Sequence, residues 1–252
     1  MYIGGATARS SGGVVISSTI PVPFRDEEYE KVPSVFPNDY REGCVAGAVC
    51  FVGNWDKALA DYKWRISNTM FVSRRQSTRG LVELTISELV DGRLLLMMRG
   101  SNTGLDPSQC PPRKWFSLSG DGGLTWSGVS DIRYDTGEQL FSPASIFRVI
   151  RSTKTGKLYF VGNITESPPD GNFPRYPLQI VEIDEEQVAF KKDTLTVIDD
   201  RDRDSEDVQF SNFSLLENRE TLDMELYMTR LGENGGGDDT WSADCCRYLL
   251  KF

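Results

Sequence analysis

The fold of this chain is constrained most by a series of short apolar runs that are separated by turn-forming residues. The runs occupy residues 13–16, 47–52, 69–72, 81–89, 93–98, 114–119, 145–150, 157–161, 178–183, 194–198, 210–216, 224–229 and 246–252. Between them stand glycine, proline, asparagine and aspartate clusters such as Asp91-Gly92 and Thr155-Gly156. This alternation predicts β-strands joined by hairpin turns. Because helical periodicity is weak and strands do not alternate with helices, the sequence predicts an all-β fold.

The strand pattern leaves three architectures open. Many short, evenly spaced strands fit a sandwich, a barrel or a propeller. The chain has 252 residues, enough for one large all-β domain or two smaller ones. At about 40 to 50 residues for a four-stranded blade, a propeller would have roughly five or six blades. Spacing alone does not select among these architectures.

Composition excludes several classes of function. The formal net charge is −9, whereas nucleic-acid binding needs clustered lysine and arginine, so we expect no nucleic-acid partner. No stretch approaches the roughly 18 apolar residues of a membrane helix, and the first residues lack the pattern of a signal peptide. The chain contains no histidine, which excludes Ser-His-Asp and Cys-His catalysis and zinc sites with a histidine ligand. We expect no metal or organic cofactor, which leaves carboxylate, tyrosine, lysine and arginine side chains for chemistry.

Residues 119–126 carry a repeat motif. They read Ser-Gly-Asp-Gly-Gly-Leu-Thr-Trp and fit the Asp-box pattern Ser-x-Asp-x-Gly-x-Thr-Trp at every fixed position. We expect Asp121 to accept backbone N–H groups, Gly123 to adopt a positive φ and Trp126 to pack under the loop. A complete box favours the propeller among the three architectures. Weaker copies, or else ordinary acidic turns, stand at 181–184 and 238–241.

Upstream of this motif, residues 80–99 read GLVELTISELVDGRLLLMMR. Glu83 precedes a Glu-Leu-x-Asp-Gly-x-Leu strand pair, and Arg99 ends the next strand. This arrangement resembles the central blade of the sialidase family. The resemblance implies a sialidase-like β-propeller in which Glu83 is the active-site glutamate. It also implies that Arg99 belongs to an arginine triad that binds the carboxylate of the substrate.

A second arginine fits the same resemblance. Residues 173–180 read FPRYPLQI, which is similar to the segment where the family presents another triad arginine at a strand start. Arg175 would then be the partner of Arg99. Planar guanidinium groups hold a carboxylate by parallel hydrogen bonds, so two or three of them would bind an acidic sugar despite the negative protein. The alternative is that Glu83 is a solvated strand residue and that the arginines form surface salt bridges.

The sequence departs from the family at the nucleophile. Sialidases use a tyrosine nucleophile with a carboxylate beside it, yet the matching position here is Phe210, which cannot attack. Tyr227 and Tyr248 lie nearby but fit core or sheet-face aromatics better. Glu83 would instead act as a general base on water while a second carboxylate protonates the leaving oxygen. The candidates for that acid precede Glu83 on expected loops, and they are Asp39, Asp56 and Asp61.

The resemblance covers residues 65–230 and hardly touches residues 1–64. We therefore expect one sialidase-like propeller domain over residues 1–252, with an N-terminal part that is shortened or differently built. The leading hypothesis is a glycoside hydrolase acting on a terminal, acidic sugar. The alternatives are a carbohydrate-binding propeller without turnover and a protein-interaction propeller. The sugar, its linkage, the oligomeric state and the cellular compartment stay open.

Overall fold

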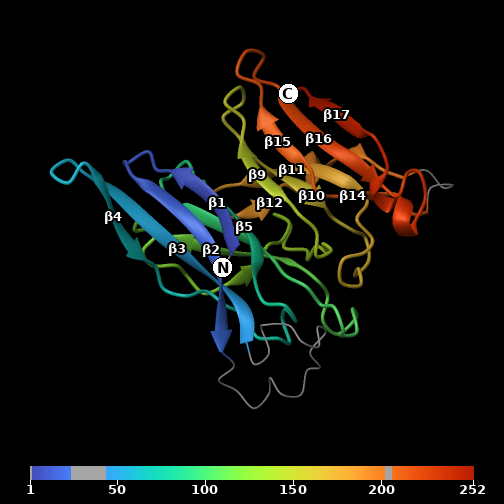
Figure 1. Ribbon diagram of the computed structural model, residues 1–252, viewed down its shortest axis with the longest axis horizontal. Coiled ribbons are helices and arrows are strands. Elements are labelled where there is room, and N and C mark those ends of the chain that lie inside the picture. The colour runs from blue at the N-terminus through green and yellow to red at the C-terminus, as the bar shows by residue number, and fades with distance from the viewer. Residues whose placement is uncertain (1, 24–43, 202–205) are drawn as a thin grey trace. The chain divides into compact units, whose positions relative to one another are not determined.

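The computed structural model describes residues 2–23, 44–201 and 206–252, and the chain divides into two compact units. Unit 1 comprises Met1–Asp131 and unit 2 comprises Ile132–Phe252. Both units are built from antiparallel sheets (Figure 1), and the described residues contain two short 3-10 helices but no α-helix. The all-β prediction is confirmed. Within the same residues, no helix is long and apolar enough to cross a membrane.

Unit 1 contains two four-stranded sheets in which each strand pairs with the next along the chain. The first sheet consists of β1 (Tyr2–Ala8), β2 (Val14–Pro23), β3 (Cys44–Asp56) and β4 (Asp61–Ile66). The second sheet consists of β5 (Val82–Glu88), β6 (Leu94–Arg99), β7 (Lys114–Ser119) and β8 (Ser130–Asp131). Such meanders are the building blocks expected of propeller blades.

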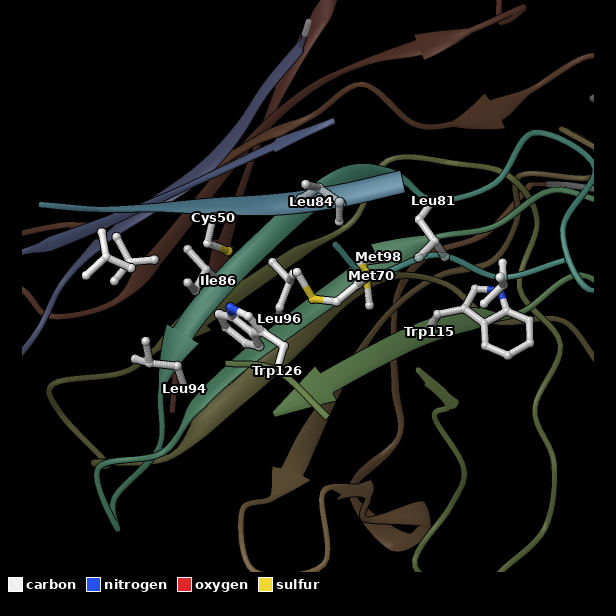
Figure 2. Packing of buried hydrophobic residues seen from close by; sticks show 14 residues of the cluster. Cys50, Met70, Leu81, Leu84, Ile86, Leu94, Leu96, Met98, Trp115 and Trp126 are labelled. Atoms are coloured by element: carbon white, nitrogen blue, oxygen red, sulfur yellow. The ribbon is translucent and has the colours of Figure 1, made fainter. Parts of the chain in front are cut away.

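The core of unit 1 joins its two sheets. Leu94, Leu96 and Met98 alternate along β6 and point into a buried cluster (Figure 2), because successive side chains of a strand face opposite sides. Val15 and Val52 contribute to the same cluster from the first sheet and are at most 1% exposed. The residues of β6 with odd numbers, including Arg99, therefore lie on the other face of the second sheet.

The turn between β7 and β8 has the hydrogen bonds that the sequence predicts. Asp121 Oδ1 accepts the backbone N–H of Leu124 and of Thr125, at 3.0 and 2.9 Å. Gly123 has a φ of +98°, a conformation that favours glycine. Trp126 is 6% exposed and donates its indole N–H to the Gly123 carbonyl at 2.9 Å. The carboxylate and the indole together fix the shape of the loop.

The two weaker copies differ from this turn and from each other. Asp184 Oδ1 accepts the N–H groups of Glu186 and Gln187, so the first copy is an acidic turn that resembles the complete one in part. The second copy lies in a 3-10 helix, Gly237–Trp241, and its tryptophan is 67% exposed. Trp241 therefore does not pack under a loop as Trp126 does.

Unit 2 also contains two sheets. One sheet consists of β9 (Arg148–Arg151), β10 (Leu158–Asn163), β11 (Leu178–Asp184), β12 (Ala189–Phe190) and β13 (Thr196–Asp199). The other consists of β14 (Gln209–Phe210), β15 (Ser214–Glu217), β16 (Met224–Leu231) and β17 (Cys245–Leu250). A second buried cluster, with Leu178, Ile180, Phe213 and Leu226, joins them.

The described residues thus form four sheets, against the five or six blades expected from the chain length. The expected number assumed about 40 to 50 residues for each blade, and this chain instead places long connections such as residues 67–81 and 100–113 between and within its sheets. Closure of the sheets into one propeller over residues 1–252 stays a prediction.

Replacing Asp121 with asparagine tests the turn through its pH dependence. Burial raises the pKa of Asp121, but hydrogen bonds from the hydroxyl and N–H of Thr125, from Ser119 and from Leu124 outweigh it and lower the pKa to about 2. Since the unfolded value is about 3.9, the carboxylate stabilises the fold above pH 4 and loses this effect as the pH falls toward 2. We expect Asp121→Asn to cost about 1–2 kcal/mol at pH 7.

Urea unfolding measured from pH 7 to pH 2 checks this expectation. The difference between wild type and Asp121→Asn should shrink as the pH falls from about 4 to about 2. Asp238→Asn, in the weaker copy, is the matched control and should change stability little at any pH. A constant difference across the range would contradict the assigned role of the Asp121 carboxylate.

Candidate functional site

Strand β5 carries a β-bulge at Glu83. Val82 pairs with Arg99, and Thr85 pairs with Met97, so three residue steps on β5 match two steps on β6. One residue is therefore extra, and Glu83 has a φ of +50°. This left-handed conformation is uncommon for a residue with a side chain and costs about 1–3 kcal/mol. Bulges of this kind redirect a side chain beside functional sites.

Glu83 and Arg99 are in contact within unit 1. Glu83 Oε2 lies 2.5 Å from Arg99 Nη1, and the two side chains are 26% and 8% exposed. The contact is an ion pair between two partly buried side chains. Glu83 and Arg99, which the sequence analysis assigns to one site, are thus in contact. Their roles in a reaction stay predictions.

Lys114 is a further cation beside this pair, and the sequence analysis missed it. The register of β6 and β7 places Lys114 directly opposite Arg99, so both side chains lie on the face away from the buried cluster. The Lys114 side chain is fully buried, which is rare for lysine. In the sequence it stands at the start of a predicted strand, and only the strand pairing reveals that it adjoins Arg99.

The segment that precedes β5 is hydrogen-bonded to the residues that follow β6. The N–H of Thr78 donates to the carbonyl of Ser101 at 2.7 Å, two residues beyond Arg99. Gly80 has a φ of +71°, and a Cβ there would lie 2.1 Å from a backbone oxygen of β3. The same segment buries Arg74, which is 8% exposed, and this burial lowers the pKa of its guanidinium. It remains a cation, because arginine does not lose its proton in proteins.

The two described acid candidates are wrong, because they lie at the far end of β3. Leu81, two residues before Glu83, donates its N–H to the carbonyl of Ala46 at 2.8 Å. Asp56 is the last residue of β3 and Asp61 pairs with it across the hairpin. The ten residues from 46 to 56 extend over on the order of 30 Å. Neither carboxyl can protonate a sugar that Glu83 contacts.

Protonation gives a second reason against Asp56. Hydrogen bonds from the Lys63 ammonium and from the backbone of Leu59 and Ala58 lower its pKa. It is therefore ionised near neutral pH and has no proton to donate. Asp39, the third candidate, lies outside the described residues.

In unit 2, Arg175 is fixed next to the start of β14. Its N–H donates to Gln209 Oε1 at 2.7 Å, and its carbonyl accepts the N–H of Phe210 at 2.8 Å. Its Nε donates to the carbonyl of Asn172 at 3.0 Å. Buried Asn163 adds a link, because its side chain donates to the Phe210 carbonyl at 3.1 Å. Arg175 is half-buried and adjoins the segment where the resemblance expects the nucleophile.

That segment contains no tyrosine. Phe210 is fully buried in the apolar cluster of unit 2. The Tyr227 hydroxyl donates to Glu225 at 2.5 Å, and this bond raises its pKa. Burial, followed by a hydrogen bond to Asp199, raises the pKa of Tyr248. Both phenols therefore stay protonated near neutral pH.

The predicted site residues thus fall into two groups. Glu83 and Arg99 belong to unit 1, whereas Arg175 belongs to unit 2. Each unit is described by itself, so the convergence of Arg175 on Arg99 stays a prediction. Within the described ranges, no three histidine, cysteine, aspartate or glutamate residues gather in a way that could hold a metal ion.

Comparison with solved structures shows a fold shared with carbohydrate-active proteins. A protein of unknown function from Dyadobacter fermentans superposes with a TM-score of 0.53 and 12% identity, over 98% of this chain and 63% of the other. NanB sialidase from Streptococcus pneumoniae superposes with a TM-score of 0.54 and 14% identity, over 91% of this chain and 28% of the sialidase. An N-acetylgalactosamine deacetylase from F. plautii superposes with a TM-score of 0.50 and 10% identity, over 97% of this chain and 70% of the deacetylase.

These likenesses show the fold alone, because all the identities are below 15%. No protein-family model matches the chain, and no curated protein matches it in sequence. The chain spans less than two thirds of the Dyadobacter protein and of NanB sialidase. The fold of this chain is therefore β-rich and similar to that of sialidases.

A double-mutant cycle tests the Glu83–Arg99 pair. Arg99→Met leaves a partly buried carboxylate without its cation, so we expect a loss of about 2–3 kcal/mol in the free energy of unfolding. Glu83→Gln alone should cost about 1 kcal/mol. The double variant should be more stable than the sum of the two losses implies, by about 1 kcal/mol or more.

Urea unfolding at pH 7 measures all three variants. Arg93→Met is the matched control, because Arg93 pairs with Asp91 in a far more exposed contact; it should cost less than about 1 kcal/mol. Additive losses at positions 83 and 99, to within about 0.5 kcal/mol, would show that the ion pair contributes nothing.

Proposed function

We propose that this chain is a sialidase-like glycoside hydrolase acting on a terminal, acidic sugar of a glycan. The observation that carries the proposal is the contact between Glu83 and Arg99 on the face of the second sheet that is turned away from the buried cluster. The sialidase-like fold supports it. The shared fold alone would not, because one fold supports many functions.

Local charge explains how an acidic protein could bind an anion. The chain carries a net charge of −9, but Arg99 and Lys114 are adjacent, buried cations with Glu83 as the carboxylate in contact with Arg99. Buried charges interact more strongly than solvated ones. Arg99 binds the sugar carboxylate through parallel hydrogen bonds, and the proposal requires Arg175 of unit 2 to reach the same group.

The reaction cannot follow the tyrosine route through Phe210. In the proposed mechanism, Glu83 takes a proton from water, whose oxygen attacks the anomeric carbon. The bond from that carbon to the leaving oxygen breaks, and a second carboxylic acid gives this oxygen a proton. The bulge makes Glu83 the extra residue of β5 beside Arg99, and bulges of this kind orient side chains at functional sites.

A carbohydrate-binding protein without turnover is the second candidate. It is favoured by Phe210, which is fully buried where a nucleophile is expected. Binding alone requires the arginines but no nucleophile and no acid. The two candidates therefore differ in what they demand of Glu83.

Variants at two positions separate these candidates. If the chain is a hydrolase, Glu83→Gln should lower kcat/KM on a terminal sialoside by about 100-fold or more, because a general base is lost. Arg99→Lys keeps the charge but not the fork of two donors, so it should weaken substrate binding by about tenfold. Release of free sugar and calorimetric titration with sialyllactose measure the two effects.

Glu88→Gln provides the control on the same strand, since Glu88 accepts hydrogen bonds from Ser10 at the far end of β5. It should leave activity unchanged. Binding that survives Glu83→Gln, is lost in Arg99→Lys and is accompanied by no sugar release supports the non-catalytic candidate. Absence of both binding and release, across terminal acidic sugars, would remove both.

A further inference from the structure

Strand β4 turns its apolar side away from the core of unit 1. Its residues alternate, with charged side chains between Tyr62, Trp64 and Ile66. Arg65 pairs with Val52 of the buried cluster, so the charged side chains of β4 lie on the side of the sheet that faces the core. Tyr62, Trp64 and Ile66 therefore lie on the opposite side, which we call the outer face. A strand normally directs its apolar side toward a core, so this pattern indicates a further layer.

The neighbouring strands continue the outer face without a charge. Phe51 and Trp55 of β3 pair with apolar residues of β4. Val14 and Ile16 of β2 pair with the same row of β3, and two alanines of β1 pair with Val14 and Ile16 in turn. None of these described positions is an aspartate, glutamate, lysine or arginine. The first sheet (Figure 1) is therefore apolar on both faces here, and the second sheet covers only one of them.

The aromatic rings of the outer face are exposed and held in place. Trp55 is 53% exposed, Trp64 is 47% exposed and Ile66 is 60% exposed. The Tyr62 ring contacts both indoles, with its centroid 5.2 Å from that of Trp55 and 5.6 Å from that of Trp64. The Trp64 ring also packs on Gly53, where a Cβ would lie 2.8 Å from it. Because these contacts already restrict the rings, a partner would bind them at little further cost in side-chain entropy.

The exposed apolar area is as large as a protein interface requires. A large aromatic side chain offers up to about 250 Å², so Trp55 and Trp64 at about half exposure contribute about 250 Å² together. With its other apolar positions the outer face exposes on the order of 600 Å², which is at the upper end of patches on monomeric proteins. Two such faces packed together would bury about 1,200 Å², the lower limit for stable, specific interfaces.

The outer face suits a second copy of this chain better than other occupants. Unlike proteins select each other largely through complementary charges, and this face has none. Two-fold symmetry instead places each outer face on an identical one, and two apolar sheet faces pack on each other as the layers of a sandwich do. A membrane surface is disfavoured, because Asp56 and Asp61 stand at the end of the same hairpin and the chain has a net charge of −9.

We infer that the outer face of the first sheet is the interface of a homodimer of this chain, formed face to face about a two-fold axis. The aromatic rows of β3 and β4 in the two copies pack together there and leave the water. The inference concerns unit 1 alone and does not depend on the proposed hydrolase activity.

Sedimentation equilibrium of the full chain, from about 1 to about 200 μM at physiological ionic strength, tests the inference. We expect a monomer–dimer equilibrium with a Kd below about 50 μM. Ile66→Glu and Trp64→Glu should each weaken association by about tenfold or more, because symmetry places the new carboxylate in the apolar interface twice. Ile66 is already 60% exposed in the single chain, so its replacement leaves folding intact, which urea unfolding checks.

Arg65→Glu is the matched control, because it places the same new side chain on the opposite side of β4. It changes the net charge more than Ile66→Glu does, so an unchanged Kd would show that general charge repulsion does not explain the effect. Equal weakening by Arg65→Glu would overturn the inference.

A chain that stays monomeric over the whole range also overturns the inference, as does a dimer that tolerates both Ile66→Glu and Trp64→Glu. Assembly beyond a dimer would contradict it, since a two-fold interface closes on itself. Sedimentation of the chain with phosphatidylcholine vesicles, abolished by Ile66→Glu, would assign the outer face to a membrane and refute the dimer.

Discussion

The bulge at Glu83 is the constraint on which the candidate site depends. Strand β5 must present Leu84 and Ile86 to the buried cluster while holding a carboxylate against Arg99. The register of Thr85 with Met97, continued without interruption, would pair Glu83 with Arg99, whereas the bulge pairs Val82 with Arg99 and leaves Glu83 as the extra residue next to it. This extra residue has a left-handed backbone, which costs about 1–3 kcal/mol. A strained backbone persists where the surrounding structure fixes it. Here the hydrogen bond from Thr78 to Ser101 and the close packing of Gly80 against β3 fix the segment before Glu83.

Turn residues made the all-β class and many of the hairpins predictable from the sequence. Asp91-Gly92 and Thr155-Gly156 do form hairpin turns, with φ values of +85° and +75° at the two glycines. The predicted strand positions were wrong where the local composition does not reflect how the strands pair. Strand β4 reads DYKWRI and has no apolar run, because it is an edge strand with exposed side chains. The run at 210–216 is broken into β14 and β15, since Asn212 adopts a φ of +58°.

The site was predictable only where spacing along one strand pair determined contact. Glu83 and Arg99 lie on adjacent strands joined by a tight hairpin, so their separation in sequence fixes their proximity. Lys114 joins them through a different pairing, after a connection of fourteen residues whose length says nothing about register. The prediction that Asp56 is the acid was wrong for a related reason. Leu81 contacts Ala46 near the beginning of β3, whereas Asp56 lies at the other end of the strand, in the hairpin with β4. The sequence does not show how far that hairpin extends, because its length depends on how β3 and β4 pair.

Net charge is a poor guide to what this chain binds, because a ligand responds mainly to the charges nearest to it. At Arg99 and Lys114, burial concentrates positive charge on one face of a sheet, and the surrounding negative surface is screened beyond a distance of about 8–10 Å in physiological salt. A ligand within a few ångströms responds to its nearest groups far more than to the total of −9. Adjacent cations on one face of a sheet can therefore bind an anion even though the protein as a whole is acidic.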